Sequence, residues 1–154
     1  MSLHDLIDNS AIIPSLRAST KKQALQEISE RASALSGLSA REIFDALLQR
    51  ERLGSTGVGG GIAIPHGKMP RVTQMLGVFA RLEKPIDYEA LDGEPVDLIF
   101  LLLAPESAGA DHLKALSRVA RALRDSTLTS RLRATKDASG LYLLLTQNPT
   151  HNAA

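Results

Sequence analysis

The side chain best placed for chemistry in this sequence is the imidazole of His66, which follows a glycine-dense segment at residues 54–61. Pro65 fixes its own φ and biases Ile64 towards extended geometry, and Gly67 removes side-chain bulk directly after the imidazole. These neighbours predict a stiff, accessible histidine at the end of a strand. A neutral imidazole is a competent nucleophile near neutral pH because its unperturbed pKa is about 6.5. A lone histidine on a glycine-rich loop is nevertheless more often structural than catalytic, so both interpretations stand at this point.

The glycines themselves could indicate a nucleotide-binding loop, but residue identities exclude both common types. A Walker loop requires Ser or Thr after Gly-Lys, whereas Gly67-Lys68 is followed by Met69. A dinucleotide fingerprint requires a third glycine where Ile62 stands, and a strand where the sequence predicts a helix. What remains is a backbone that can turn sharply and approach another group closely. Ser55 and Thr56 could offer hydroxyls to an anion there, although turn formation is the commoner role of such residues.

A second histidine, His112, is predicted at the N-terminus of a helix, directly after Asp111 as the capping residue. Free N–H groups and the helix dipole favour an anion at that position and disfavour protonation of the imidazole. His112 is therefore a candidate for holding phosphate, with an ordinary surface position in a first turn as the alternative. The other two histidines, His4 and His151, lie near the chain ends, and no histidine or carboxylate pair has ligand spacing. The sequence accordingly predicts no metal site.

Two capped helices are predicted ahead of the glycine-dense segment. Thr20 begins a capping-box pattern that opens the first, with apolar positions at helical spacing up to Gly37. Ser39 opens the second in the same way, and this helix is predicted to end at Gly54. Its predicted inner face carries Ile43, Phe44, Leu47 and Leu48.

Strands and further helices are predicted after that segment. The apolar stretches 75–82 and 96–103 are predicted as strands, and the second is apolar enough to be covered on both faces. A helix is predicted from near Asp111, and two more at 128–134 and 138–146. The inner face of the helix near Asp111 is predicted to carry Leu113, Leu116, Val119, Ala120 and Leu123. Strands that alternate with capped helices predict an α/β layer architecture.

Composition predicts a single compact domain of ordinary globular type. Of the 154 residues 44% are hydrophobic and 23% charged, and the net charge is +1. Aromatic residues make up only 3%, which together with the small charge argues against nucleic-acid binding. Because cysteine is absent, disulfides, thiolate zinc sites and a cysteine nucleophile are excluded. With no signal peptide or membrane-spanning run, a cytoplasmic location without membrane insertion is expected, and residues 147–154 are predicted to form a flexible tail.

A family resemblance is carried by three motifs: Arg50-Glu51, Gly54-Ser55-Thr56-Gly57 and Gly61-Ile62-Ala63-Ile64-Pro65-His66-Gly67-Lys68. Together they resemble the fructose/mannitol-type enzyme IIA domain of the bacterial phosphotransferase system, most of all its nitrogen-regulatory branch. The likeness continues through residues 94–98 and from His112 to Arg124, so it covers most of the chain.

The resemblance implies a mixed β-sheet flanked by α-helices, with residues 1–154 forming one enzyme IIA type 2 domain. It implies that His66 accepts a phosphoryl group at Nε2, that His112 and Arg50 stabilise the phosphate, and that no cofactor takes part. The expected donor is a histidine phosphocarrier protein. These parts suit phosphoryl transfer, whose loose transition state needs mainly positioning and charge stabilisation. Without the resemblance, a solvated contact near Gly54 is an equally good interpretation of Arg50.

Three functions remain open from the sequence. The leading one is a regulatory phosphocarrier, whose phosphorylation state controls partner proteins that the sequence does not identify. The alternative is a sugar-transport enzyme IIA that passes phosphate to a separate fructose or mannitol enzyme IIB. Matching IIB domains use a phosphocysteine, so none is expected within this cysteine-free sequence. The third is a binding module without phosphotransfer, against which the intact His66 and His112 argue. A docking patch for partners is expected from residues 54–61, Met69 and the start of the His112 helix.

Overall fold

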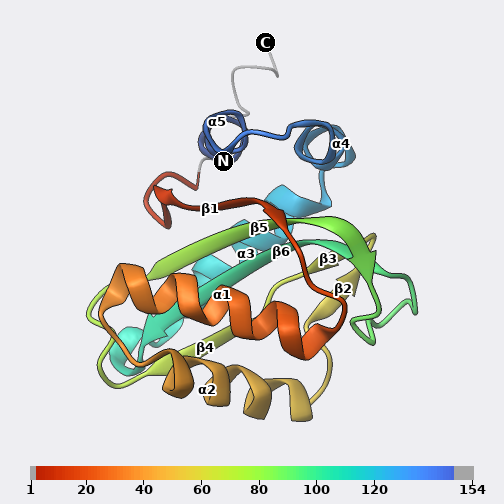
Figure 1. The fold of residues 1–154 in the computed structure, drawn as a ribbon. Coiled ribbons are helices and arrows are strands. Elements are labelled where there is room, and N and C mark those ends of the chain that lie inside the picture. Colours follow the sequence, from red (N-terminus) through yellow and green to blue (C-terminus); the bar gives the residue numbers. More distant parts are fainter. Residues whose placement is uncertain (1–2, 148–154) are drawn as a thin grey trace.

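A mixed β-sheet of six strands forms the centre of the computed structural model, which describes residues 3–147 (Figure 1). Its strands follow the order β1 (Ile7–Leu16), β5 (Leu76–Ile86), β6 (Val96–Pro105), β3 (Ile62–Ala63) and β2 (Gly57–Gly59), and β4 (His66–Met69) also pairs with β6. β1 is parallel to β5, β5 is antiparallel to β6, and both β3 and β4 are parallel to β6. Except for Gln147, the predicted tail lies outside the described residues.

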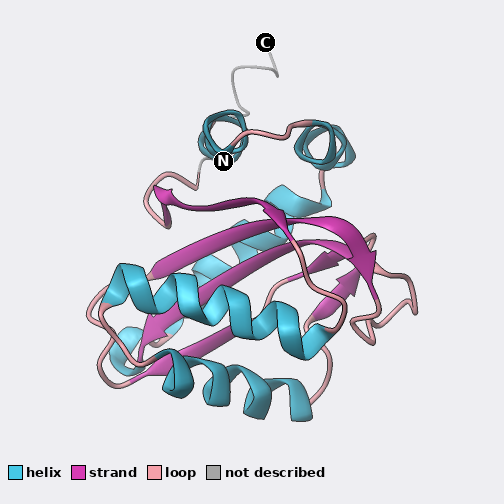
Figure 2. Ribbon diagram, viewed as in Figure 1, coloured by secondary structure: helices cyan, strands magenta, loops and turns pink. Residues whose placement is uncertain are grey.

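Helices cover both faces of the sheet (Figures 1 and 2). On one face lie α1 (Lys21–Ser36) and α2 (Ala40–Arg52), and on the other lies α3 (Ala110–Arg124). Beyond β1 lie α4 (Ser126–Ala134) and α5 (Ala138–Thr146), of which α5 contacts β1. The predicted fold class, an α/β fold with a mixed sheet flanked by helices, is confirmed.

The caps predicted for the first two helices are confirmed. The hydroxyl of Thr20 accepts a hydrogen bond from the backbone N–H three residues on at 3.1 Å, and the hydroxyl of Ser39 does the same at 3.3 Å. Gly37 follows α1 with a φ of 78°, the left-handed conformation that closes a helix. α2 ends at Arg52 instead of at the predicted Gly54, because that glycine, with a φ of 144°, already lies past the last helical turn.

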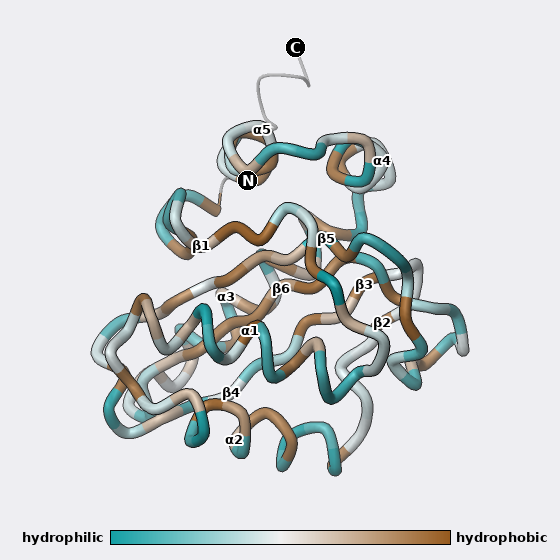
Figure 3. Tube along the Cα trace, viewed as in Figure 1, coloured by the Kyte–Doolittle hydropathy of each residue, from teal (hydrophilic) through white to brown (hydrophobic). Residues whose placement is uncertain are grey.

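β6 is the most deeply buried strand. Residues 98–104 are all fully buried, which confirms that this apolar stretch is covered on both faces. Figure 3 shows the hydrophobic segments of β5 and β6 together in the middle of the fold. β5 extends beyond the predicted 75–82, since it continues to Ile86 after a register shift against β6.

β1 is a strand that the sequence does not reveal. It lies at the edge of the sheet and, among the strands within residues 3–147, pairs only with β5, so part of it faces solvent. Exposed Asp8, Asn9 and Ser10 interrupt any apolar alternation, and Pro14 is a residue that sheets tolerate mainly at edges. Its assignment therefore depends on the neighbouring strand and not on a local pattern.

The glycine-dense segment is a hairpin and not an irregular loop. β2 and β3 pair antiparallel, and the glycines 59–61 between and beside them have φ values from 66° to 106°, a region that only glycine enters without strain. A side chain at Gly57 would meet Cβ of Ala90 at 2.7 Å, so β2 lies close against the segment that follows β5. The hairpin leads directly into the segment that carries His66.

α3 begins two residues earlier than the predicted cap at Asp111 implies. Its N-cap is Gly109, which makes no side-chain hydrogen bond, so the predicted capping role of Asp111 is wrong, and this residue lies in the first turn. His112 is 6% exposed, whereas Leu113, predicted on the inner face, is 67% exposed. The buried positions follow helical spacing as His112, Ala115, Val119 and Leu123. The inner position at the start of this helix therefore belongs to the imidazole.

Candidate functional site

His66 is the first residue of β4, where it lies opposite Leu102 of β6. Its Nδ1 is 2.8 Å from the carbonyl oxygen of Ile64. A carbonyl oxygen can only accept, so Nδ1 carries the proton and donates it. Nε2 is then left with a lone pair, which is the form needed for nucleophilic attack. The ring is half-buried instead of fully accessible.

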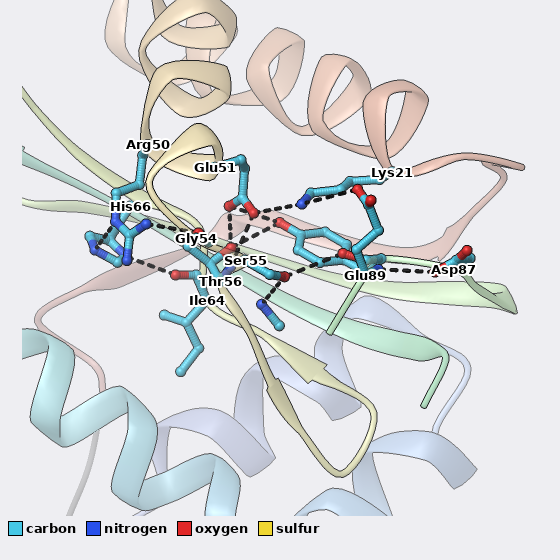
Figure 4. Close-up of polar contacts among 12 residues, drawn as sticks. Lys21, Arg50, Glu51, Gly54, Ser55, Thr56, Ile64, His66, Asp87 and Glu89 are labelled. Atoms are coloured by element: carbon cyan, nitrogen blue, oxygen red, sulfur yellow. Dashed lines mark hydrogen bonds and ion pairs between the residues drawn. The ribbon is translucent and has the colours of Figure 1, made fainter. Parts of the chain in front are cut away.

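Arg50 reaches the same imidazole from the last turn of α2 (Figure 4). Its Nε is 3.3 Å from Nε2 of His66, and its Nη1 donates to the carbonyl oxygen of Gly54 at 2.9 Å. Both interpretations of Arg50 therefore hold at once, because the guanidinium contacts the candidate nucleophile and also makes the local contact four residues on. Since arginine only donates, its bond to Nε2 agrees with a proton on Nδ1.

His112 approaches from the first turn of α3. The ring centroids of His66 and His112 are 5.7 Å apart, with 59° between the ring planes. Nε2 of His112 is buried and has no hydrogen-bond partner within the described residues. A buried polar atom left unpaired costs about 1–3 kcal/mol, so it is the kind of group that a polar ligand would satisfy. The structure thus brings together His66, His112 and Arg50, the three residues singled out from the sequence.

Burial lowers the pKa of both imidazoles from the usual value of 6.5. For His66, desolvation is the main cause and Arg50 adds to it, while the hydrogen bond to Ile64 and the charge of Glu51 oppose it. For His112, desolvation is again the main cause, followed by nearby positive charges. Both rings are therefore neutral at pH 7, which keeps a lone pair available on each.

We expect both imidazoles to titrate below pH 6.5. Because their pKa values are lowered by folding, the unfolded chain binds protons more readily, so stability is complete above about pH 6.5 and falls as the pH decreases below it. An NMR titration of the ring nitrogens, assigned with the His66→Gln and His112→Gln variants, measures the midpoints. A midpoint at or above 6.5 for either ring would contradict the expected burial effect.

A buried polar network adjoins the site, and sequence reasoning did not find it (Figure 4). Glu51, next to Arg50, accepts hydrogen bonds from the N–H of Thr56 at 3.0 Å and from the Thr56 hydroxyl, and it lies 2.8 Å from Nζ of Lys21. The hydroxyl of buried Tyr88 is 3.0 Å from Oγ1 of Thr56, and burial raises the pKa of that phenol, so it stays protonated. The dipeptide Arg50-Glu51 is the sequence signal, but most of its partners are distant in the chain.

The hydroxyl groups of Ser55 and Thr56, which directly precede the hairpin, are engaged away from the imidazole. Ser55 donates to the carbonyl oxygen of Tyr88 at 3.3 Å and accepts from the N–H of Gly57 at 3.1 Å. The Thr56 hydroxyl bonds to Glu51. These contacts favour the turn-forming interpretation of both residues over direct phosphate binding.

The surface near the histidines carries exposed apolar side chains, but Met69 is not among them. Met69 is 5% exposed, so its predicted place in a docking patch is wrong. Successive strand residues point to opposite sides, and since Lys68 is exposed, Met69 turns towards the core. Exposed leucines instead flank the site in the chain: Leu53, which follows α2, is 84% exposed, and Leu113 at the start of α3 has been described above.

Neither a membrane span nor a metal-type cluster occurs among residues 3–147. No helix in this range is both long and apolar enough to cross a bilayer. No group of three or more histidine, aspartate or glutamate side chains in the same range could hold a metal ion.

Comparisons with known proteins agree on one family. The family model described as phosphoenolpyruvate-dependent sugar phosphotransferase system, EIIA 2, matches residues 5–148. The nitrogen regulatory protein of Bradyrhizobium diazoefficiens is 55% identical over 149 residues, which cover 97% of each chain. That of Escherichia coli K12 is 42% identical over 147 residues, covering 95% of this chain and 90% of the other. The crystal structure of nitrogen regulatory protein IIA-Ntr from Neisseria meningitidis has a TM-score of 0.87 at 37% identity, covering 92% of this chain and 97% of that chain.

Proposed function

Because the chain belongs to the type 2 enzyme IIA family of the phosphoenolpyruvate-dependent sugar phosphotransferase system, in its nitrogen-regulatory branch, we propose that it is a phosphocarrier acting through His66. In this proposal a histidine phosphocarrier protein in the cytoplasm donates the phosphoryl group, and the phosphorylation state of His66 controls which partners bind. The observation that supports it best is the hydrogen bond from Nδ1 of His66 to Ile64, because it leaves Nε2 as the nucleophile.

The transfer exchanges one nitrogen–phosphorus bond for another. The Nε2 lone pair of His66 attacks the phosphorus of the donor phosphohistidine, and a bond forms to Nε2. The bond to the donor nitrogen breaks, and its electron pair returns to the donor imidazole. The proton on Nδ1 of His66 stays in place, so the ring carries a positive charge once it is phosphorylated. The carbonyl oxygen of Ile64 accepts from that N–H and favours this charge.

Arg50 and His112 stabilise the phosphoryl group in this proposal. The Arg50 guanidinium lies against Nε2 of His66 in the unphosphorylated protein, so it turns aside as the phosphorus approaches and donates to the phosphate oxygens. Nε2 of His112 lies in the first turn of α3, where backbone N–H groups and the helix dipole favour an anion. Together they supply the positioning and charge that a loose transition state requires.

Intact-mass measurement tests the proposal. The protein is incubated with enzyme I, the histidine phosphocarrier and phosphoenolpyruvate, and we expect a single phosphoryl adduct that is labile in acid and stable in alkali. The absence of an adduct in the presence of an active carrier would contradict the proposal. A fructose- or mannitol-type enzyme IIB is added next. Retention of phosphate on His66 supports the regulatory role, and rapid transfer to the IIB cysteine would favour sugar transport instead.

We expect the carrier to cover Leu53 and Leu113 when its histidine approaches His66. Replacing either leucine with Asp should raise the Kd for the carrier about fivefold or more, because the interface then loses an apolar contact and buries an unpaired carboxylate, which together cost more than about 1 kcal/mol. Leu143 on α5 is 61% exposed and serves as the matched control, so Leu143→Asp should bind as the wild type does. Calorimetric titration measures the affinities of the wild type and of the three variants. Weakening in the Leu143 variant alone would place the docking surface on α5.

A further inference from the structure

Glu51 stands at the start of a series of hydrogen bonds that ends at Nδ1 of His66 (Figure 4). We propose that Glu51 is a positioning residue for phosphoryl transfer, which acts through Thr56 and Ile64 to hold the carbonyl group that fixes the tautomer of His66. The inference rests on His66 being the phosphoryl acceptor, as proposed above. Glu51 acts through these two residues and not on the reacting atoms.

The first link holds Thr56 in place. Oε1 of Glu51 accepts from the N–H of Thr56 at 3.0 Å, and Oε2 accepts from its hydroxyl. The Glu51 side chain is only 6% exposed, and Lys21 balances its charge at 2.8 Å while lying over the ring of Tyr88. Hydrogen bonds to a charged group contribute about 1.5–3 kcal/mol each, more than neutral ones. Thr56 is thus anchored by both its main chain and its side chain.

The next two links run from Thr56 to the imidazole. The carbonyl oxygen of Thr56 accepts from the N–H of Ile64 at 2.9 Å, and the carbonyl oxygen of Ile64 accepts from Nδ1 of His66 at 2.8 Å. Ile64 is buried, and because it precedes Pro65 its backbone is restricted to extended geometry. With its N–H held and its conformation restricted, Ile64 presents its carbonyl in one direction. A shift of Thr56 is therefore passed on to the group that selects the tautomer.

The charge of Glu51 acts in the same sense as these hydrogen bonds. The phosphorylated ring is positive, and a nearby carboxylate favours that charge. Two other groups face His66: the guanidinium of Arg50, whose positive charge disfavours a positive ring, and the imidazole of His112, which lies beside it. Of these groups, Glu51 alone raises the pKa of His66 through its charge. Glu51 therefore supports both the reactive tautomer and the charge that develops on transfer.

The Glu51→Gln variant tests the inference. Glutamine keeps the size of the side chain, but its NH₂ group cannot accept, so Thr56 loses one of its two acceptors. We expect the fraction of His66 with the proton on Nε2 to rise several-fold, as measured by ring ¹⁵N shifts of the unphosphorylated protein. The rate constant for transfer from the phosphorylated carrier should fall about tenfold, as expected for losing roughly one hydrogen bond. Half-saturation by the carrier should stay unchanged, because docking does not involve Glu51.

Tyr88→Phe is the matched control, since it removes a hydroxyl from the same network and leaves both bonds between Glu51 and Thr56. It should lower the unfolding temperature and keep the wild-type tautomer and rate. If Glu51→Gln does not fold, Lys21→Gln takes its place, because it removes the more exposed partner of the ion pair. This variant must raise the fraction of His66 with the proton on Nε2 above that of the wild type, by less than the several-fold rise expected for Glu51→Gln. A folded Glu51→Gln variant with the wild-type tautomer and rate would overturn the inference, as would an equal change in Tyr88→Phe. Failure of the wild type to accept phosphate would refute the proposed function and with it the role of Glu51 in transfer, while the tautomer measurement would still decide whether Glu51 fixes the tautomer of His66.

Discussion

The His66→Ala variant should fold normally and accept no phosphoryl group. His66 combines a proton fixed on Nδ1, a lone pair on Nε2 and an adjacent guanidinium, so its removal takes away the proposed nucleophile. The imidazole is half-buried and does not belong to the hydrophobic core, so the loss in stability should be an ordinary one of about 1 kcal/mol. Intact-mass spectrometry after incubation with the phosphorylated carrier measures the adduct, and circular dichroism checks the fold.

His4→Ala serves as the control for removing a histidine, because His4 is an exposed residue that precedes the edge strand β1. This variant should be phosphorylated to the same extent as the wild type. An adduct of undiminished yield in His66→Ala would disprove the assignment of the acceptor. If the adduct then mapped to His112, the roles of the two histidines would be reversed.

The second large effect is expected for His112→Ala, which should still accept phosphate but transfer and hold it poorly. The loss of one charge-assisted contact to a phosphate costs about 1.5–3 kcal/mol, which corresponds to roughly a tenfold to hundredfold slower transfer. Two observations motivate this expectation. Nε2 of His112 has no hydrogen-bond partner within the described residues, and the ring centroids of His112 and His66 are 5.7 Å apart. Quench-flow measurement of phosphoryl transfer in both directions gives the rates.

His112→Gln separates the lost contact from a packing defect. Its side-chain amide restores a donor near the position of Nε2, so it should recover part of the lost rate while leaving the helix start filled. Transfer and dephosphorylation rates equal to the wild type in His112→Ala would remove this residue from the proposed mechanism.

Features with local causes could be predicted from the sequence. A capping hydroxyl needs only a backbone N–H three residues on, so Thr20 and Ser39 were identified correctly. The continuous apolar run of β6 required burial on both faces whatever its neighbours were. The restricted backbone around Pro65 likewise pointed to His66 before any contact was known.

Features that depend on distant partners could not be predicted. β1 is a strand only because β5 lies beside it, and Met69 is buried only because β4 adopts a particular register against β6. At the start of α3, Asp111 had the right residue type for a cap, but the helix begins at the preceding residue. Glu51 reads as an exposed helix residue until Lys21, Thr56 and Tyr88 are brought around it. The same distinction between local and distant causes applies to the candidate site. The sequence indicated His66, His112 and Arg50 one by one, but it did not predict that they contact one another.

The attachment of both histidine-bearing segments to β6 makes the meeting of the two imidazoles depend on the formation of the central sheet. β4, which starts at His66, is held in place by β6, and α3 follows β6 after the short 3₁₀ turn Glu106–Ala108. Pairings between segments so far apart in the chain are slow to form. A chain in which β4 and β6 have not yet paired therefore lacks the contact between His66 and His112, so the two imidazoles meet only once the central sheet has formed.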